Sequence, residues 1–523
     1  DLHSFPTRRS SDLVAALTLE DIQNVAKKYF KQDYITIEFE EGDPKKHKLE
    51  KPDIKPLDPP QGKQTEYSQH FKQIPQGEVK EVYNDFADVT QIELDPQIKL
   101  FYTKNDQNNI FSIVLNYGIG TEKMPMLDYA VSLMNTAGIM PSTDAQQFRR
   151  QLSELGGACN YSVNGSYFNV SISGKEENLA QICQLVQKQM LMPKLDKQQL
   201  DNVKGQALVS RIVMPRQESA QTSALINYAV YGKKSPYIDV VPFMDIYNLT
   251  IPQLHAEFQK ATEYSLKIHY VGAMPVGDVK DILMGNLPLK EGMRASESPI
   301  VKERVTYDKQ TIFFLPNANL QQANIYFYID GDPYEIAQDV AYDAFDQYFS
   351  GGFSGLVMNE IREKRSMAYT AYGYMSQPAV TGKKSYFIGY VGSQSDKVAD
   401  AIDVYMDLLN NMPEYPDRLD NIKTYLRQTA LTAKPTMRDK SLIFAKWQRM
   451  GYVEDPAKVN MDKINNLTFD EIVSFYKEHI QGKPITIVIT GDPKKIDTKQ
   501  IQANHGKITK LSKSRLFAPL DFD

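Results

Sequence analysis

The chain has 523 residues, of which 42% are hydrophobic and 24% are charged, and its formal net charge is −5. This composition is typical of a globular protein long enough for about three domains. The sequence contains neither a long block of one charge sign nor an apolar run that could cross a bilayer, so nothing in it indicates nucleic-acid binding or a membrane span.

The first 13 residues lack the sequence patterns of a folded segment. Residues 1–13 begin with Asp and show neither helix nor strand periodicity, and HSFPTRRSSDL (3–13) resembles the translation of a short-read sequencing adapter. We therefore interpret 1–13 as an assembly artefact and exclude it from fold reasoning. On this interpretation a signal peptide or a whole upstream half is missing, so the compartment stays open between a bacterial periplasm and cytoplasm.

A pattern of capped helix, strand and turn occurs three times, over 17–46, 249–275 and 467–495. Each copy begins with Leu-Thr and has an acid or amide three residues after the Thr, which predicts a helix that starts with a capping box. In the first copy Ile35, Ile37 and Phe39 alternate with polar residues, which predicts a strand. The first and last copies both end in GDPKK.

Other features recur at a nearly constant separation of about 215 to 220 residues, which indicates duplicated modules. They are Asn109-Ile110 with Asn324-Ile325, SYF at 166–168 with 385–387, and Met192-Pro193 with Met412-Pro413.

These repeats predict the domain organisation. Residues 14–43 are the C-terminal tail of a preceding module, and 44–85, rich in Pro, Lys and Gln, are a linker between two halves. Two modules follow at 86–295 and 300–497, and 498–523 are a tail. In each module a strand, a helical run, a second strand and further helices alternate. The predicted fold class is therefore α+β: two homologous α/β sandwich modules with mostly antiparallel sheets and packed helices, after the tail of a preceding module.

The stretch GGFSGLVMNEIREKRSMAYTAYGY (351–374) carries a resemblance to a known family. Together with the module order, it is similar to the pitrilysin/insulinase family of zinc metallopeptidases, and the resemblance covers nearly all of 14–510. It implies that 86–295 and 300–497 are modules three and four, the C-terminal half of a clam-shell enzyme that closes around a peptide.

The resemblance also implies where zinc chemistry would lie. The family holds zinc with an H-x-x-E-H helix and a distant Glu in its first module. In module three Tyr129, Ser132 and Leu133 stand at the motif positions, and Ser210 or Arg211 stands where the distant Glu would fall. The corresponding FDQYF (345–349) of module four also lacks His. We therefore predict that this chain binds no zinc, and that zinc in the complete enzyme belongs to an N-terminal half.

Two residues match family positions that act across the chamber. By the resemblance, Tyr369 is a catalytic residue that donates a hydrogen bond to the oxyanion of the tetrahedral intermediate, and Arg362 binds the substrate backbone. The implied partners are a peptide substrate and the zinc-bearing N-terminal half, in the same polypeptide or as a separate subunit. No nucleic acid and no membrane span are expected.

Three functional hypotheses remain open. The chain is the half of a metalloendopeptidase that is inactive alone, or a non-catalytic peptide-binding subunit that pairs with a separate zinc-bearing chain. A purely structural scaffold is the third, and it predicts that Arg362 and Tyr369 lie buried away from any cavity.

Simpler readings apply to several other residues. Gly351, Gly352 and Gly355 predict a turn that starts a helix rather than a phosphate cradle. His269 alternates with apolar residues on a predicted strand and is expected to face solvent. Cys159 and Cys183 fit either one disulfide or two free thiols.

Overall fold

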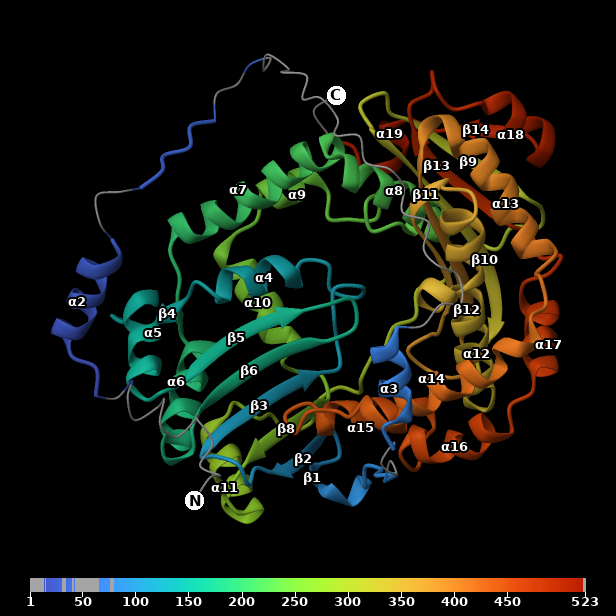
Figure 1. Ribbon diagram of the computed structural model, residues 1–523. Helices are drawn as coiled ribbons and strands as arrows, with labels where there is room; N and C mark the ends of the chain where they lie inside the picture. Colours follow the sequence, from blue (N-terminus) through green and yellow to red (C-terminus); the bar gives the residue numbers. More distant parts are fainter. Residues whose placement is uncertain are drawn as a thin grey trace. The chain divides into compact units, whose positions relative to one another are not determined.

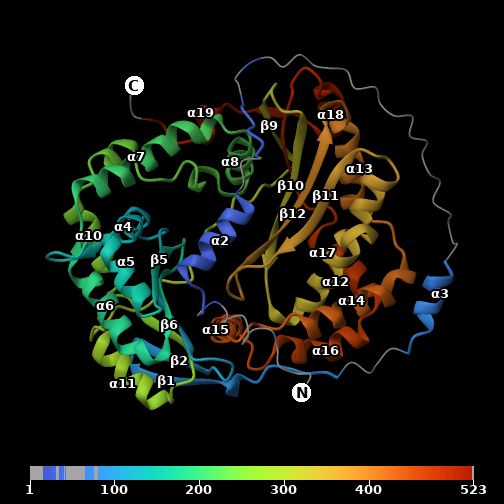
Figure 2. The same ribbon diagram turned by 60° about the vertical axis from the view of Figure 1, so that its left-hand side comes forward.

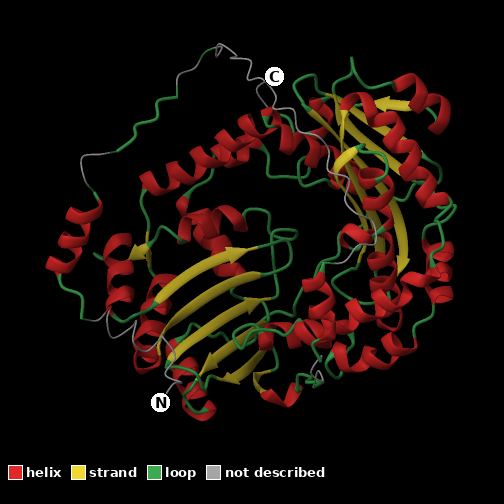
Figure 3. Cartoon of the chain, in the orientation of Figure 1, coloured by secondary structure: helices red, strands yellow, loops and turns green. Residues whose placement is uncertain are grey.

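The computed structural model describes residues 14, 16–30, 34–39, 42, 65–75 and 80–520 (Figure 1; Figure 3 shows the same chain by secondary structure). The chain divides into a unit of residues 1–79 and a unit of residues 80–523. The predicted artefact at 1–13 and the stretch 43–64 of the predicted linker lie outside the described residues.

The first unit contains two described helices, α2 (Leu19–Tyr29) and α3 (Glu66–Gln73). The capping box of α2 is as predicted: Thr18 accepts from the backbone of Asp21, whose carboxylate accepts from the backbone N–H of Thr18. Residues 34–39 form no strand, so the prediction of a strand there is not met within this unit. α3 lies within the segment expected to be a linker.

The second unit holds two six-stranded sheets. The sheet of module three has the order β5-β6-β3-β8-β2-β1, with bounds β1 Val89–Asp95, β2 Ile98–Lys104, β3 Ile110–Tyr117, β5 Ala158–Val163, β6 Phe168–Lys175 and β8 Leu266–Gly272. The sheet of module four has the order β11-β12-β10-β13-β9-β14, with bounds β9 Thr311–Pro316, β10 Gln322–Pro333, β11 Ala368–Ser376, β12 Lys384–Gln394, β13 Thr486–Gly491 and β14 Ile508–Lys510. A two-stranded sheet pairs β4 (Gly138–Ile139) with β7 (Pro193–Lys194).

The two large sheets share the order and pairing sense of five strands. In each, four strands are antiparallel and the fifth is parallel to its neighbour: β2 beside β8, and β9 beside β13. The sixth strands differ, because β1 is antiparallel to β2 whereas β14 is parallel to β9. The predicted fold class, two α/β modules with mostly antiparallel sheets, is confirmed.

Helices cover one face of each sheet. Those of module three are α4 Leu127–Met134, α5 Ala145–Glu154, α6 Leu179–Leu191, α7 Lys197–Val213, α8 Glu218–Tyr231, α9 Phe243–Tyr247, α10 Ile251–Ala261 and α11 Val276–Asn286. Those of module four are α12 Asp339–Ser350, α13 Val398–Asn410, α14 Leu419–Thr432, α15 Lys440–Met450, α16 Pro456–Asn466 and α17 Phe469–His479, followed by α18 Thr498–His505 and α19 Lys513–Leu516. Within the described part of the chain, no helix is both long and apolar enough to cross a membrane.

Strand alternation explains how each module forms a core. Along β3 every second residue is buried, and Phe111, Ile113 and Leu115 are fully inaccessible because they face the helices. Cys183 also lies in this core, and both cysteines are free thiols whose pKa burial raises to about 12. The segment expected as a tail contributes to module four, since β14 joins its sheet.

The two modules exchange helices. Helix α8 of module three packs on the sheet of module four, where Leu225 clusters with Leu315 and Val488. Helix α15 of module four packs on the sheet of module three, where Phe444 clusters with Phe101. Figure 1 shows α15 beside β8 and β2, and Figure 2 shows α8 beside β9. Each module therefore contributes a helix that buries apolar side chains on the sheet of the other module.

This exchange overturns the expectation for His269. Its side chain is only 3% exposed, stacks on Phe101 with 4.8 Å between ring centroids, and lies 3.1 Å from the hydroxyl of Ser441 on α15. Burial lowers its pKa to about 3, so the imidazole is neutral. The prediction of a solvent-facing His269 was wrong because the second face of the strand is covered by a helix from the other module.

Candidate functional site

A glycine-rich turn positions the candidate site in module four. Helix α12 ends at Gly351, Gly352 has φ +58°, and a helical stretch begins directly after Gly355. A Cβ on Gly355 would lie 2.6 Å from the backbone of Ser350, so only glycine fits there. The prediction of a helix-starting turn is confirmed.

The helical stretch continues as a π-helix, Met358–Glu363, which is a rare conformation that often marks functional sites. Its buried Glu360 is 2.5 Å from the ammonium of Lys364 and 2.6 Å from the guanidinium of Arg365. Burial acts to raise the pKa of Glu360, but the hydrogen bonds and charges of these two cations outweigh it and lower the pKa. These charge-assisted contacts fix the helix that presents Arg362.

The chain then reverses sharply into β11. Ser366 adopts φ 51°, its N–H donates to the carbonyl of Arg362 at 2.9 Å, and the N–H of Met367 donates to Ile361 at 3.0 Å. This turn brings the second residue of β11, Tyr369, under Arg362: the guanidinium lies 4.9 Å from the ring centroid. A sequence separation of seven residues thereby becomes a direct contact.

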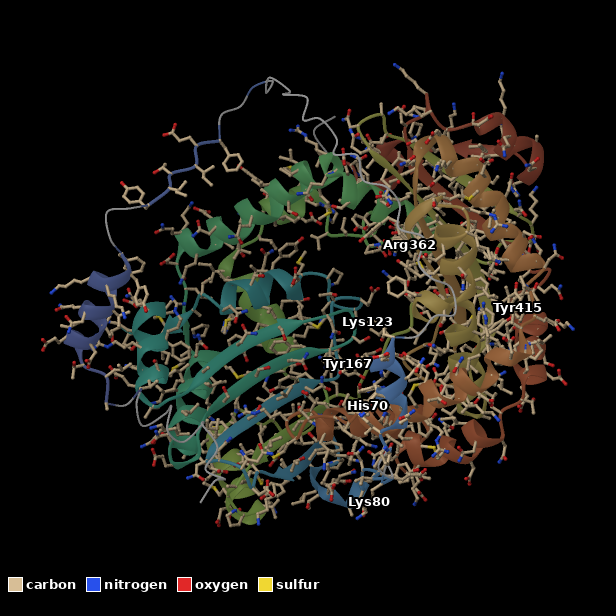
Figure 4. All side chains as sticks on the ribbon, in the orientation of Figure 1. His70, Lys80, Lys123, Tyr167, Arg362 and Tyr415 are labelled. Atoms are coloured by element: carbon tan, nitrogen blue, oxygen red, sulfur yellow. The ribbon has the colours of Figure 1, made fainter. Side chains whose placement is uncertain are left out.

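The pair is accessible. Tyr369 is 76% exposed, and with Arg362 it lines a pocket of about 540 Å³ that also includes Gln322, Glu363 and Gln394. Arg362 is labelled in Figure 4 on the module-four side of the second unit. The scaffold hypothesis required both side chains to lie away from any cavity, and that requirement is contradicted.

Phe353 is a member of the site that the sequence did not single out. The guanidinium of Arg362 lies 5.5 Å from its ring centroid, so the cation contacts two aromatic rings. Phe353 is 72% exposed in the turn Gly352–Ser354. A large aromatic side chain inside a glycine-rich turn is the signal that could have identified it.

The positions expected to be degenerate for zinc lie in module three. Tyr129, Ser132, Ser210 and Arg211 line one pocket of about 350 Å³, whereas Leu133 is buried in the core. Burial raises the pKa of Tyr129. A protonated phenol, a hydroxyl and a guanidinium do not fit zinc, which prefers imidazole, thiolate and carboxylate ligands.

Among the described residues, no group of three or more His, Cys, Asp or Glu side chains is placed to hold a metal ion.

The C-terminal segment reaches the module-three pocket that Tyr129 and Ser132 line. Phe517 and Ala518 line it, and the N–H of Ala518 donates to the carbonyl of Tyr237 at 2.8 Å. No local pattern in the sequence indicates this contact, because its partners lie about 280 residues apart.

Residues 267–426 match the family model described as the peptidase M16 inactive domain. This segment is therefore similar to peptidase M16 inactive domains. The matched segment contains α12, the π-helix and β11, and thus both Arg362 and Tyr369. This confirms the resemblance to the pitrilysin/insulinase family. A comparison of the sequence with curated proteins returned no significant match.

Solved structures share the fold of this chain. A peptidase M16 inactive domain from Pseudomonas fluorescens matches with TM-score 0.59 and 16% identity over 77% of this chain and 98% of its own. The periplasmic protease PqqL from Escherichia coli matches with TM-score 0.62 and 13% identity over 92% of this chain and 52% of its own. The ferredoxin protease FusC, in complex with Arabidopsis ferredoxin, matches with TM-score 0.62 and 11% identity over 91% of this chain and 50% of its own.

Proposed function

We propose that this chain is the C-terminal half of an insulinase-like zinc metalloendopeptidase. It closes the chamber, binds an extended peptide and assists hydrolysis of a peptide bond by a zinc site in an N-terminal half. The observation that carries the proposal is the stacked, accessible pair of Arg362 and Tyr369 at the wall of a pocket. In keeping with this division of roles, the motif positions of module three do not fit zinc.

The roles of the two residues follow from their chemistry. The phenol of Tyr369 donates a hydrogen bond to the oxyanion that forms on the scissile carbonyl. The guanidinium of Arg362 donates to substrate backbone carbonyls, and its stacking on the phenol ring holds both donors in one geometry. The chain alone is expected to hydrolyse nothing.

The first unit supports the idea of a missing preceding module. The helix α2 has no buried residue, yet Leu19, Ile22 and Val25 are apolar and exposed, as are Ile35 and Phe39 beyond it. An amphipathic helix normally buries such a stripe against a sheet. We interpret 14–43 as the end of module two, 44–85 as the link between halves, and modules three and four as products of one duplication.

The alternative is a non-catalytic peptide-binding subunit that pairs with a separate zinc-bearing chain. The same pair would then bind peptide without affecting the chemical step. Sequencing the genomic DNA upstream of this chain distinguishes the two arrangements. A fused zinc-bearing half would extend the same reading frame, whereas a separate chain would be encoded by another gene.

A complementation assay tests the role of Tyr369. The chain is combined with a zinc-bearing M16 half, and turnover of a fluorogenic peptide is compared for wild type, Tyr369→Phe and the control Tyr247→Phe. Tyr247 is 57% exposed in module three. Loss of one oxyanion donor should reduce kcat about 10²- to 10³-fold. Turnover by Tyr369→Phe equal to that of Tyr247→Phe would rule out the catalytic role.

A further inference from the structure

Module four contains a second recess, beside the open edge of its sheet. A pocket of about 1020 Å³ lies between α12, β11 and α14, and is lined by Asp343, Asp346, Ser350 and Tyr425 among others. A narrower recess of about 190 Å³ adjoins it and is lined by Asp339, Asp343, Asp455 and Asn460 among others. The two share Asp343, Leu426 and Thr429, and we call them together the acidic groove.

Two carboxylates of the acidic groove have no cationic partner among the described residues. Among the described residues neither Asp343 nor Asp346 has a salt-bridge partner within 4.0 Å, and Asp346 accepts a hydrogen bond from the N–H of Met375 at 2.8 Å. The side chain of Asp343 is exposed to the groove, but displacement of part of its water by the surrounding protein and the charge of Asp339 raise its pKa to about 7. Burial also raises the pKa of Asp346. A cation placed between them would relieve this cost.

An unpaired acceptor lines the narrow recess. Asn460 is only 7% exposed, and its Oδ1 has no hydrogen-bond partner. Its Nδ2 donates to Asp339 at 3.3 Å, which fixes the amide orientation. Leaving a buried acceptor unsatisfied costs about 1–3 kcal/mol. The recess therefore combines carboxylates with an amide oxygen that lacks a donor.

The strand edge shows which part of a peptide the groove can recognise. β11 is the last strand of its sheet, but the N–H groups of Gly373 and Met375 already donate to Ser350 at 3.0 Å and to Asp346 at 2.8 Å. Strand addition by a peptide backbone would have to break both contacts. The groove is therefore suited to a side chain, and Tyr374 and Tyr425, each about half exposed, offer surfaces for its methylene groups.

We propose that the acidic groove binds a lysine or arginine side chain of a peptide, with its cationic end beside Asp343 and Asp346. This proposal rests on the proposed function, because it assumes a peptide ligand. The groove adjoins the Arg362–Tyr369 site through Phe353, which lines the groove and contacts Arg362. A bound peptide thus places a basic residue at a fixed distance from the bond next to Tyr369, which makes the groove a determinant of cleavage specificity.

Direct binding tests the groove without requiring catalysis. Two fluorescein-labelled extended peptides, identical except for one Lys or Gln, are titrated with the purified full chain, and anisotropy is measured at low salt. Wild type should bind the Lys peptide about tenfold more tightly. Asp343→Asn should remove that preference and leave the Gln peptide unchanged. The control Asp281→Asn, on α11 of module three, makes the same change of charge and should preserve the preference.

The outcomes separate the two proposals. Equal affinity of wild type for both peptides, or equal effects of Asp343→Asn and Asp281→Asn, overturns the groove proposal and leaves the role of Tyr369 intact. No binding of either peptide to wild type refutes peptide binding by this chain, and with it both proposals. Loss of turnover in Tyr369→Phe together with an unchanged Lys preference supports both.

Discussion

The exchange of helices predicts that modules three and four unfold as one cooperative unit. Leu225 of α8 is fully buried against Leu315 and Val488 of the other module. Leu225→Ala removes its transfer free energy and leaves a cavity in that contact, which together cost about 2–5 kcal/mol. At an m-value of about 3 kcal/mol/M, a loss of about 3 kcal/mol lowers the urea midpoint by about 1 M.

The chain provides its own probe, because its single tryptophan, Trp447, lies on the other exchanged helix, α15. Trp447 packs with Phe444 and Phe86 at the sheet of module three, and it also packs against the core of module four. Urea unfolding is followed by Trp447 fluorescence and by far-UV circular dichroism. Both transitions should move together in Leu225→Ala, although the mutated contact is in the other module's sheet.

The same substitution at an exposed site is the control. Leu191 is 46% exposed on α6, and Leu191→Ala should change the unfolding free energy by less than about 0.5 kcal/mol. If Leu225→Ala leaves the Trp447 transition in place while the circular dichroism transition splits, the two modules unfold independently and the reasoning fails.

Three further predictions concern single positions in or near the described site. Because the folded state raises the pKa of Asp343 above its ordinary value, wild-type stability falls as pH rises from about 4 to about 7, so Asp343→Asn should raise Tm at pH 8 and leave it unchanged at pH 4. The pKa of Glu360 is lowered, so Glu360→Gln should destabilise by about 1–3 kcal/mol at pH 7, and this difference should shrink as pH falls below 4; a constant difference in calorimetry contradicts the ion-pair account. Gly205→Ala, in the open middle of α7, should stabilise by about 0.5–1 kcal/mol in a urea melt, whereas Gly355→Ala should destabilise because its Cβ meets backbone at 2.6 Å.

Local patterns in the sequence correctly predicted the features that depend on contacts between residues close in the chain. The capping boxes at Thr250 and Thr468 form as expected, since both partners lie within one turn. The first and second strands expected in module four form as β10 and β12.

Contacts between distant segments could not be predicted in this way. Period-two alternation predicts that His269 points away from the helices of its own module. It could not show that α15, about 170 residues later, covers that face of the strand. Likewise, the spacing of Arg362 and Tyr369 did not imply a stack, because the contact depends on the reversal at Ser366. Asp343 and Asp346 share a helix face, but the recess they line also needs α14 and β11.

Unfavourable local features concentrate between 353 and 369. Among the described residues, the positive φ of a non-glycine residue occurs at Ser366 and the π-helix occurs at Met358–Glu363, while Phe353 and Tyr369 expose large aromatic surfaces. Each feature costs free energy, although the π-helix also places Ile361 in the core. Such costs persist where the surrounding structure compensates for them, and here the ion pairs of Glu360 do so. The arrangement holds Arg362 over Tyr369 in one orientation, which is what the proposed pair of hydrogen-bond donors requires.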